Sequence, residues 1–218
     1  MNHLALASLR GREILRRFDL RPVPADQPAF ASAAATAADL ADALAPGRMV
    51  LVTGPSGAGK TCLLRQLADR IGPRAITSDD LHLSDRPVID CLHELSIEDA
   101  LHLLARFGLG EPRTYLLLPH QLSCGERFRL KLAMAFSRAS RVGRANAPAV
   151  LIADEFATQL DRVTARIIAR NLRRAIDGHA TLCAVVATCH EDLSGALRPD
   201  QSVQCDFGRY TDGKRSAA

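Results

Sequence analysis

The sequence predicts an α/β fold in which helices cover a mainly parallel sheet. Three observations support this prediction: short apolar runs alternate with amphipathic segments, a glycine-rich turn joins the first run to a helix, and a second run ends in two acids. The composition agrees, because 47% of the 218 residues are hydrophobic and 24% are charged. A chain of this size and balance forms one good-sized domain, which excludes a disordered or disulfide-framework protein.

The first 45 residues are expected to form a helical and extended segment ahead of a core domain at 46–218. Residues 1–21 have the pattern of a basic helix, and three prolines between positions 22 and 28 then break the chain. Ala31–Ala45 has high helix propensity and is followed by Pro-Gly, which ends helices.

Strands and helices alternate along the core domain. Runs of Val, Leu, Ile and Ala predict buried parallel strands, and apolar residues at helical spacing predict amphipathic helices. The predicted strands are Met49–Thr53, Ala149–Ala153 and Leu182–Thr188, and the predicted helices are Lys60–Ile71, Ser96–Phe107, Glu126–Ala139 and Arg162–Ile176.

No stretch of the sequence has the pattern of a membrane span, so we expect no direct membrane insertion. The longest apolar stretch, Ala180–Thr188, is about half of the roughly 20 residues that a spanning helix needs. The six cysteines form no C-x-x-C pair, and charged residues interrupt the N-terminus early. Both features favour a reduced, cytoplasmic chain. A net charge of +4 permits an acidic partner without demanding one.

The glycine-rich turn after the first strand fits the P-loop pattern at every required position. In such a loop, glycines let successive backbone N–H groups point at phosphate oxygens, and the following helix presents its positive end to them. Lys60 is predicted to reach the β- and γ-phosphates, and the hydroxyl of Thr61 to bind Mg²⁺. The predicted nucleotide-binding residues of this segment are Gly54, Pro55, Ser56, Gly57, Ala58, Gly59, Lys60, Thr61 and Cys62.

Two acids close the second strand. The carboxyl ends of parallel strands are where an α/β sheet places its ligands, so Asp154 and Glu155 are expected at the same edge as the P-loop. Strands often end in a solvated acid, but behind a P-loop the pair predicts a hydrolase. Asp154 would hold Mg²⁺, and Glu155 would polarise the attacking water.

A third motif, Leu-Ser-Cys-Gly-Glu at 122–126, lies before a helix and ahead of the acidic strand. It resembles the signature of the ABC ATPases, which is usually Leu-Ser-Gly-Gly followed by Gln or Glu. A serine before a helix is by itself an ordinary N-cap. The position of this motif between the other two supports the resemblance, which implies an ABC-type core with a small helical subdomain at about 92–140.

Two further segments fall in the order of that family. Thr158–Asp161 resembles the ABC D-loop, and His190 ends the third strand where the family carries a switch histidine. The resemblance implies that two chains pair head to tail with ATP between them. Ser123 and Gly125 of one chain would then face the γ-phosphate held by the other, with Asp161 close to the same nucleotide. The catalytic residues would be Glu155, His190 and Lys60.

The chain departs from the pattern of a transporter ATPase in three ways. Leu122 lies only 62 positions after Lys60, and 78–95 contains no Q-loop glutamine, for which Asp85 or Asp90 would be a replacement. The stretch before the P-loop is helical, where transporter ATPases have antiparallel strands and an adenine-stacking tyrosine. We considered Phe18 and Phe30 as substitutes for that tyrosine, although core packing is the usual role of phenylalanine.

Three functions therefore stay open. The first is a cytoplasmic ATP hydrolase that works as a dimer, closer to a group of soluble ABC ATPases because Phe156 follows the acids where transporter subunits have Pro. The second is the ATP-binding subunit of a membrane transporter with a permease partner. The third is a nucleotide-gated regulator of nucleic acid or protein. It is suggested by the stretch Arg127–Arg144, which holds six basic residues and no acid. Helices after ABC signatures are commonly Arg-rich, however, and a solvated helix face is the favoured explanation of this stretch.

Overall fold

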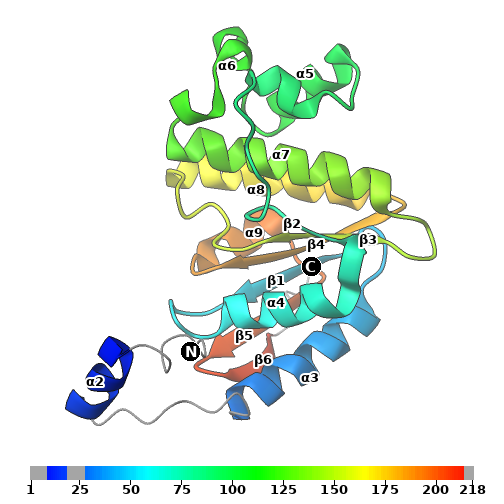
Figure 1. Ribbon diagram of the computed structural model, residues 1–218. Coiled ribbons are helices and arrows are strands. Elements are labelled where there is room, and N and C mark those ends of the chain that lie inside the picture. Colours follow the sequence, from blue (N-terminus) through cyan, green and yellow to red (C-terminus); the bar gives the residue numbers. More distant parts are fainter. Residues whose placement is uncertain (1–8, 19–27, 214–218) are drawn as a thin grey trace.

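The computed structural model describes residues 9–18 and 28–213, and it contains one six-stranded sheet in the order β2-β3-β4-β1-β5-β6. The first five strands of this order run parallel, and β6 pairs antiparallel with β5 (Figure 1). The predicted α/β fold with a mainly parallel sheet is therefore confirmed. The strands are β1 (Met49–Thr53), β2 (Ala75–Thr77), β3 (Ala149–Ala153), β4 (Leu182–Thr188), β5 (Gln201–Asp206) and β6 (Arg209–Gly213).

The three predicted strands are β1, β3 and β4, with the bounds given by their apolar runs. Almost every residue in them is buried, because helices cover both faces of the sheet. The other three strands were not predicted. Strand β2 has only three residues, and β5 is polar at alternate positions, as expected of a strand near the edge of the sheet.

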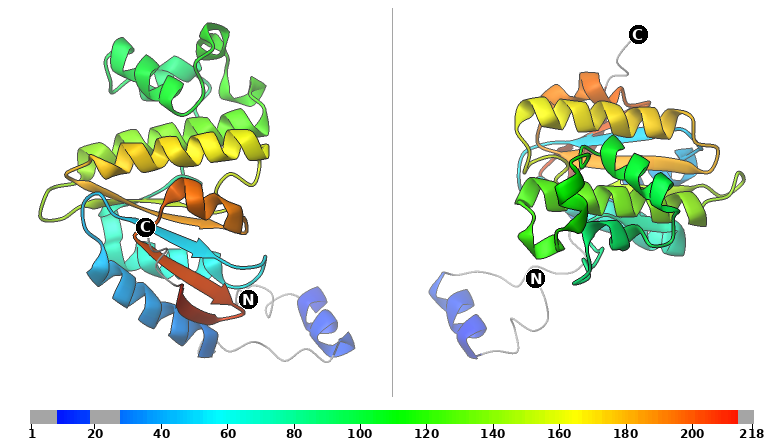
Figure 2. Two further views of the ribbon diagram at one scale, coloured as in Figure 1. Left: turned by 180° about the vertical axis from the view of Figure 1, so that it is seen from behind. Right: turned by 90° about the horizontal axis from the view of Figure 1, so that it is seen from above.

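Two hydrophobic clusters lie on opposite faces of the sheet. Alternate residues of the central strands point to opposite sides, so Leu51 and Leu151 join one cluster and Val50 and Val150 the other. Helices α7, α8 and α9 cover the first face, and α3 and α4 cover the second (Figures 1 and 2). The helices are α2 (Leu9–Arg17), α3 (Pro28–Ala43), α4 (Lys60–Ile71), α5 (Ile97–Arg106), α6 (Pro112–Leu116), α7 (Cys124–Val142), α8 (Arg162–Asp177) and α9 (Ser194–Leu197).

The helices follow the predicted pattern with shifted ends. Ser96, the first residue of the predicted helix 96–107, is the N-cap of α5, since its hydroxyl accepts the backbone N–H of Asp99 at 3.1 Å. Helix α7 begins at Cys124 and ends at Val142, so it is longer than predicted, and α6 was not predicted. Of the predicted N-terminal helix at 1–21, only 9–18 lie within the described residues.

The domain boundary at residue 45 stays a prediction, as does the helical subdomain. Ala37 and Leu40 of α3 belong to the same hydrophobic cluster as β1 and α4, so α3 packs directly on the core. Helices α5 and α6 lie above α7, on the side away from the sheet (Figure 1). Among the described helices, none combines the length and apolar character that crossing a bilayer requires.

Candidate functional site

The loop between β1 and α4 is shaped by glycine. Gly54, Gly57 and Gly59 have φ angles of 143°, 78° and 102°, values that other residues rarely adopt. Gly59 caps α4, and no side chain accepts from the first N–H groups of that helix. Within the loop the N–H of Ala58 donates to the carbonyl oxygen of Pro55 at 3.2 Å. The N–H groups at the start of α4 have no side-chain cap, as a phosphate-binding helix start requires.

Lys60 is the buried cation of this loop, with a relative exposure of 8%. Its Nζ donates to the carbonyl oxygens of Gly54 and Pro55, both at 2.8 Å. A lysine ammonium has three N–H donors, so one remains for a bound anion. The two carbonyl contacts fix the ammonium in the concave side of the loop, where phosphate oxygens would lie.

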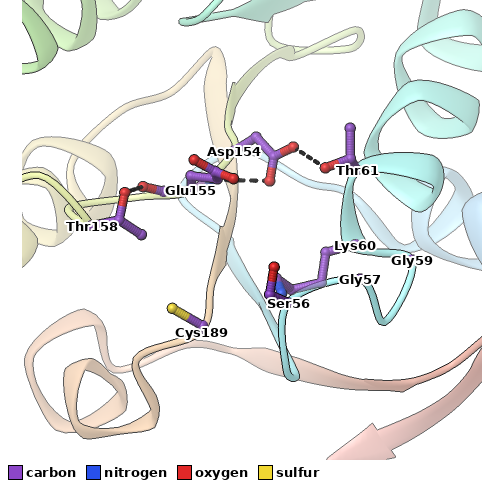
Figure 3. Close-up of a pocket in the computed structure, with 9 residues that line it drawn as sticks. All are labelled: Ser56, Gly57, Gly59, Lys60, Thr61, Asp154, Glu155, Thr158 and Cys189. Atoms are coloured by element: carbon purple, nitrogen blue, oxygen red, sulfur yellow. Dashed lines mark hydrogen bonds between the residues drawn. The ribbon is translucent and has the colours of Figure 1, made fainter.

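The acids at the end of β3 lie across from this loop. The hydroxyl of Thr61 donates to Oδ2 of Asp154 at 2.5 Å, although 93 positions separate the two residues (Figure 3). The other oxygen of Asp154 accepts the backbone N–H of Glu155 at 2.9 Å. The two motifs that the sequence placed at one edge of the sheet are thus in direct contact.

The backbone at Glu155 is strained. Glu155 and Ala157 have φ angles of 43° and 60°, in the left-handed region that side chains disfavour. The turn is held in place because Phe156 is fully buried and its N–H donates to Ala187 at 2.8 Å. The hydroxyl of Thr158 donates to the carbonyl oxygen of Glu155 at 2.9 Å (Figure 3). This turn leaves the carboxylate of Glu155 exposed at the cavity, and strain of this kind collects at functional sites.

The loop and the acids line one cavity of about 390 Å³. Its lining is almost entirely polar or glycine and contains no aromatic side chain. The lining residues are Ser56, Gly57, Gly59, Lys60, Thr61, Asp154, Glu155, Thr158 and Cys189. A polar cavity with a lysine, a hydroxyl and two carboxylates can bind a phosphorylated ligand and activate water beside it.

A second cavity of about 200 Å³ shares Thr61 and Asp154 with the first. Asp79 and Asp80, which follow β2, line it. Burial raises the pKa of Asp79, the nearby Lys131 ammonium opposes that change, and the charges of Asp154 and other acids add to it. Neither Asp85 nor Asp90 lines either cavity, and the acids of this segment that line a cavity with Asp154 are Asp79 and Asp80. The replacement of the Q-loop glutamine by Asp85 or Asp90 stays a prediction.

Several predicted residues lie outside the first cavity. Ser123 caps α7, where its Oγ donates to Glu126 at 2.7 Å and accepts the Glu126 N–H, and Gly125 packs closely against Leu160. The Ser123 hydroxyl and the Ser123 backbone N–H both donate to the Glu126 carboxylate, and these two hydrogen bonds lower the pKa of Glu126. Asp161 caps α8 by accepting two backbone N–H groups at 3.0 and 2.9 Å.

His190 is also absent from the lining, where its neighbour Cys189 takes the position. The Nδ1 atom of His190 lies 3.8 Å from the Cys189 sulfur. Of the predicted phosphate-binding segment, Gly54, Pro55 and Ala58 in the loop and Cys62 in α4 do not line the cavity. The side chain of Phe30 lies outside the described residues, and Phe18, at 67% exposure, follows α2.

The sequence reasoning did not identify Thr158, Cys189, Asp79 and Asp80 as cavity residues. Thr158 and Cys189 lie within motifs that it did quote, so their positions directly after the acids and at a strand end were available signals. Asp79 and Asp80 follow a strand of three residues, which is too short for a hydrophobic pattern to identify.

The oxygen donors at Thr61 and Asp154 are of the kind that Mg²⁺ prefers, and the open N–H groups of the loop suit phosphate. Within 9–18 and 28–213, no group of three or more His, Cys, Asp or Glu side chains could hold a metal ion alone. All six cysteines are free. A metal ion here would need further oxygens from a phosphorylated ligand, which is how Mg²⁺ binds at such sites.

The basic stretch after the signature is largely engaged within the chain. Arg129 donates to the carbonyl oxygen of Gly108 at 2.6 Å, Lys131 donates to that of Asp79 at 2.9 Å, and Arg141 pairs with Glu94. These contacts fit a structural role for three of the six basic residues.

Comparison with known proteins places the chain among nucleotide-binding ATPases. A family model described as an AAA ATPase domain matches residues 32–185. The lipoprotein-releasing system ATP-binding protein LolD of Maricaulis maris is 30% identical over 192 aligned positions, covering 71% of this chain and 79% of that protein. LolD 1 of Rhodospirillum rubrum is 30% identical over 212 positions, which cover 80% of this chain and 87% of that protein.

Solved structures support the same fold. A dimeric bacterial ABC transporter cassette has a TM-score of 0.58 at 20% identity and covers 78% of this chain and 87% of its own. An ATP-binding cassette dimer in a post-hydrolysis state with ADP and phosphate has a TM-score of 0.57 at 19% identity. The match covers 77% of this chain and 86% of that one. With the P-loop, the acidic strand and the signature in order, the chain belongs to the ABC-type ATPases of the P-loop NTPase superfamily.

Proposed function

We propose that this chain hydrolyses ATP to ADP and phosphate as a cytoplasmic, nucleotide-switched dimer. The observation that carries the proposal is the contact between Thr61 on the P-loop helix and Asp154 at the end of β3, at 2.5 Å. It brings the phosphate-binding loop and the two acids to one cavity, and Glu155 borders that cavity with its carboxylate exposed. Phosphoryl transfer to water needs these parts together.

The chain's own groups account for the steps of the reaction. The loop N–H groups and the free N–H of Lys60 bind the β- and γ-phosphates. Glu155 orients a water molecule and accepts its proton as the water oxygen bonds to the γ-phosphorus, while the bond from that phosphorus to the β-phosphate bridging oxygen breaks and ADP leaves. Thr61 and Asp154 would hold Mg²⁺, which when bound neutralises charge on the phosphates.

Dimerisation explains why Ser123 and Gly125 lie outside the cavity of their own chain. In the free chain the Ser123 hydroxyl donates to Glu126 and caps α7. A γ-phosphate bound by the partner chain would replace this acceptor and meet the start of α7, which is an anion-binding position. Gly125 packs against Leu160 of the D-loop, so the signature and the D-loop form one surface. His190 would contact the same phosphate.

The names of the relatives favour a second candidate for what the ATP cycle drives. LolD belongs to a lipoprotein-releasing system, and a hemin import ATP-binding protein of Rhodopseudomonas palustris is 27% identical over 202 positions, covering 78% of this chain and 75% of its own. In this candidate the chain is the ATP-binding subunit of a membrane transporter and binds a permease. Two features differ from that class: helix α3 stands where antiparallel strands are expected, and residues 78–95 contain no glutamine.

The test is ATP turnover by Glu155→Gln protein. The amide keeps the size of the side chain and cannot accept the water proton, so phosphate release should fall about 100-fold or more while ATP still binds. Glu111→Gln is the matched control, because Glu111 is exposed on the helical subdomain and makes no side-chain cap, and this variant should keep full turnover. Full hydrolysis by Glu155→Gln would overturn the proposed role of Glu155, and failure of the wild-type chain to hydrolyse ATP would overturn the function.

A further inference from the structure

The hairpin that joins β5 to β6 has an unusual tip. Asp206 pairs with Arg209, so Phe207 and Gly208 form a two-residue turn, and their φ angles are 43° and 87°. Two positive φ angles define a type I′ turn, in which asparagine or aspartate followed by glycine is preferred. A phenylalanine at the first position is sterically disfavoured, and strain of this kind collects at functional sites.

The tip lies against the P-loop. The N–H of Gly208 donates to the carbonyl oxygen of Ala58 at 3.2 Å, and the hydroxyl of Tyr210 donates to that of Gly59 at 3.2 Å. Burial raises the pKa of Tyr210 to about 12, so the phenol stays protonated and remains a donor. A Cβ atom on Gly54 would lie 2.2 Å from the carbonyl oxygen of Cys205, so β5 also abuts the start of the loop.

The side chain of Phe207 is largely open to solvent. Its residue is 71% exposed, and among the described residues Phe18 is the other exposed phenylalanine. The ring is therefore not a core residue, and a single exposed aromatic beside a ligand loop is available to the ligand. The cavity that would hold the phosphates has no aromatic side chain in its lining. An aromatic ring that stacks on the base of the nucleotide must therefore lie outside this cavity.

Resting on the proposed function, we infer that Phe207 is the stacking platform for the base of the bound nucleotide. The hairpin tip would then take the place of the tyrosine-bearing strand that transporter ATPases have before the P-loop, where this chain has the helix α3. The planar ring would lie against one face of the purine, and the hydrogen bonds from Gly208 and Tyr210 fix its position relative to the phosphates. Stacking uses the π-face that every base has, so ATP and GTP would benefit alike.

The test compares two ligands and three variants by isothermal titration calorimetry with Mg²⁺ present. Phe207→Asn removes the ring and installs the residue that a type I′ turn prefers, so the hairpin should fold at least as well. Its affinity for ATP should fall by about 5- to 150-fold, while its affinity for inorganic tripolyphosphate should stay the same. Phe207→Tyr should keep ATP affinity, and Leu116→Ala, which removes another exposed apolar side chain, is the control that should also keep it.

The outcomes separate this inference from the proposed function. Loss of ATP affinity with unchanged tripolyphosphate binding supports the platform. Equal loss for both ligands overturns it, because Phe207 would then act through the shape of the loop. Unchanged ATP affinity in Phe207→Asn also overturns it and leaves the proposed function standing. Failure of the wild-type chain to bind either ligand overturns the proposed function itself.

Discussion

At the carboxyl edge of the sheet, where β1 and β3 end, charged groups lack opposite-charge partners within the described chain. Lys60 donates only to carbonyl oxygens, and Glu155 sits on a strained backbone with its carboxylate exposed. At the amino edge, where the same strands begin, a cation is paired with two carboxylates: Arg173 forms ion pairs with Asp177 and Asp200.

The difference shows how one sheet separates binding from stability. Asp200 also accepts the N–H of Met49 at 2.7 Å, so the paired edge fixes the first residue of β1. The open edge keeps donors and carboxylates available for a ligand. Unpaired charges and backbone strain at this edge lower the stability of the fold, so other regions must compensate for them. Substitutions at the two edges should therefore affect different measurements.

The largest effect is expected at the open edge. Asp154→Asn should lower ATP turnover by about 100-fold or more, because the site loses the carboxylate that would hold Mg²⁺. The urea midpoint should stay the same or rise, since Asp154 adds negative charge near Asp79. Asp39→Asn, on the exposed side of α3, is the control that should leave both measurements unchanged. A fall in the urea midpoint that matches the loss of activity would contradict the separation.

The opposite result is expected at the paired edge. Arg173→Met should lower the free energy of unfolding by about 2–3 kcal/mol, because the Arg173 side chain is 11% exposed and its guanidinium bridges two carboxylates that keep some solvent contact. Turnover per folded molecule should not change. Its exposed neighbour Arg174 offers the matched control, and Arg174→Met should stay within about 0.5 kcal/mol of wild type. Reduced turnover at unchanged stability in Arg173→Met would show that this edge has a functional role.

Backbone packing at the amino edge gives a third comparison. A Cβ atom on Gly143, between α7 and β3, would lie 2.0 Å from the carbonyl oxygen of Thr181. Gly143→Ala should therefore destabilise the chain by about 1–3 kcal/mol in thermal denaturation. Gly178, after α8, has open space around its Cβ position, and Gly178→Ala should change stability by no more than about 0.5 kcal/mol. Equal melting temperatures for the two variants would contradict the close packing at Gly143.

The smallest effects concern pH, and the two edges should differ in sign. Burial alone would raise the pKa of Asp200, but the hydrogen bond from the Met49 N–H and the charge of Arg173 lower this pKa overall. The ionised Asp200 carboxylate therefore stabilises the fold fully above its unfolded-state pKa of about 3.9, and this stabilisation is lost as pH falls through the folded-state pKa. The pKa of Asp79 is raised, mainly by burial. Because the folded chain disfavours the ionised carboxylate, stability falls as pH rises from the unfolded-state pKa of Asp79 through its folded-state pKa.

Urea denaturation at several pH values between 3 and 7 measures both contributions. Asp200→Asn should flatten the loss of stability toward acid pH. Asp79→Asn should remove a loss that appears toward neutral pH, leaving the variant as stable as wild type or more so. The same direction of change in both variants would contradict the assigned pKa shifts.

Much of the fold was predictable because the central strands are buried on both faces. Their continuous apolar runs gave β1, β3 and β4 with correct ends. Strand β2 is too short to produce a pattern, and β5 and β6 are polar strands whose pairing depends on the neighbouring β1. Sequence periodicity reports burial, so elements with little burial were missed.

The candidate site follows the same division. The P-loop and the acids at 154–155 were predictable because each motif is local and lies next to a recognisable strand. The approach of Asp79 to Asp154, and of the Phe207 tip to the loop, depends on which strands are neighbours in the sheet. Spacing along the chain does not contain that information, since Gly208 and Ala58 meet across 150 positions.

The most direct test of the central claim is the oligomeric state of Glu155→Gln protein by sedimentation velocity with saturating ATP and Mg²⁺. We expect a dimer with ATP and a monomer with ADP. When Ser123→Arg is added, the protein should stay a monomer with ATP, because the arginine would block the signature surface that faces the nucleotide of the partner chain. A Glu155→Gln chain that has bound ATP and still sediments as a monomer would contradict the central claim.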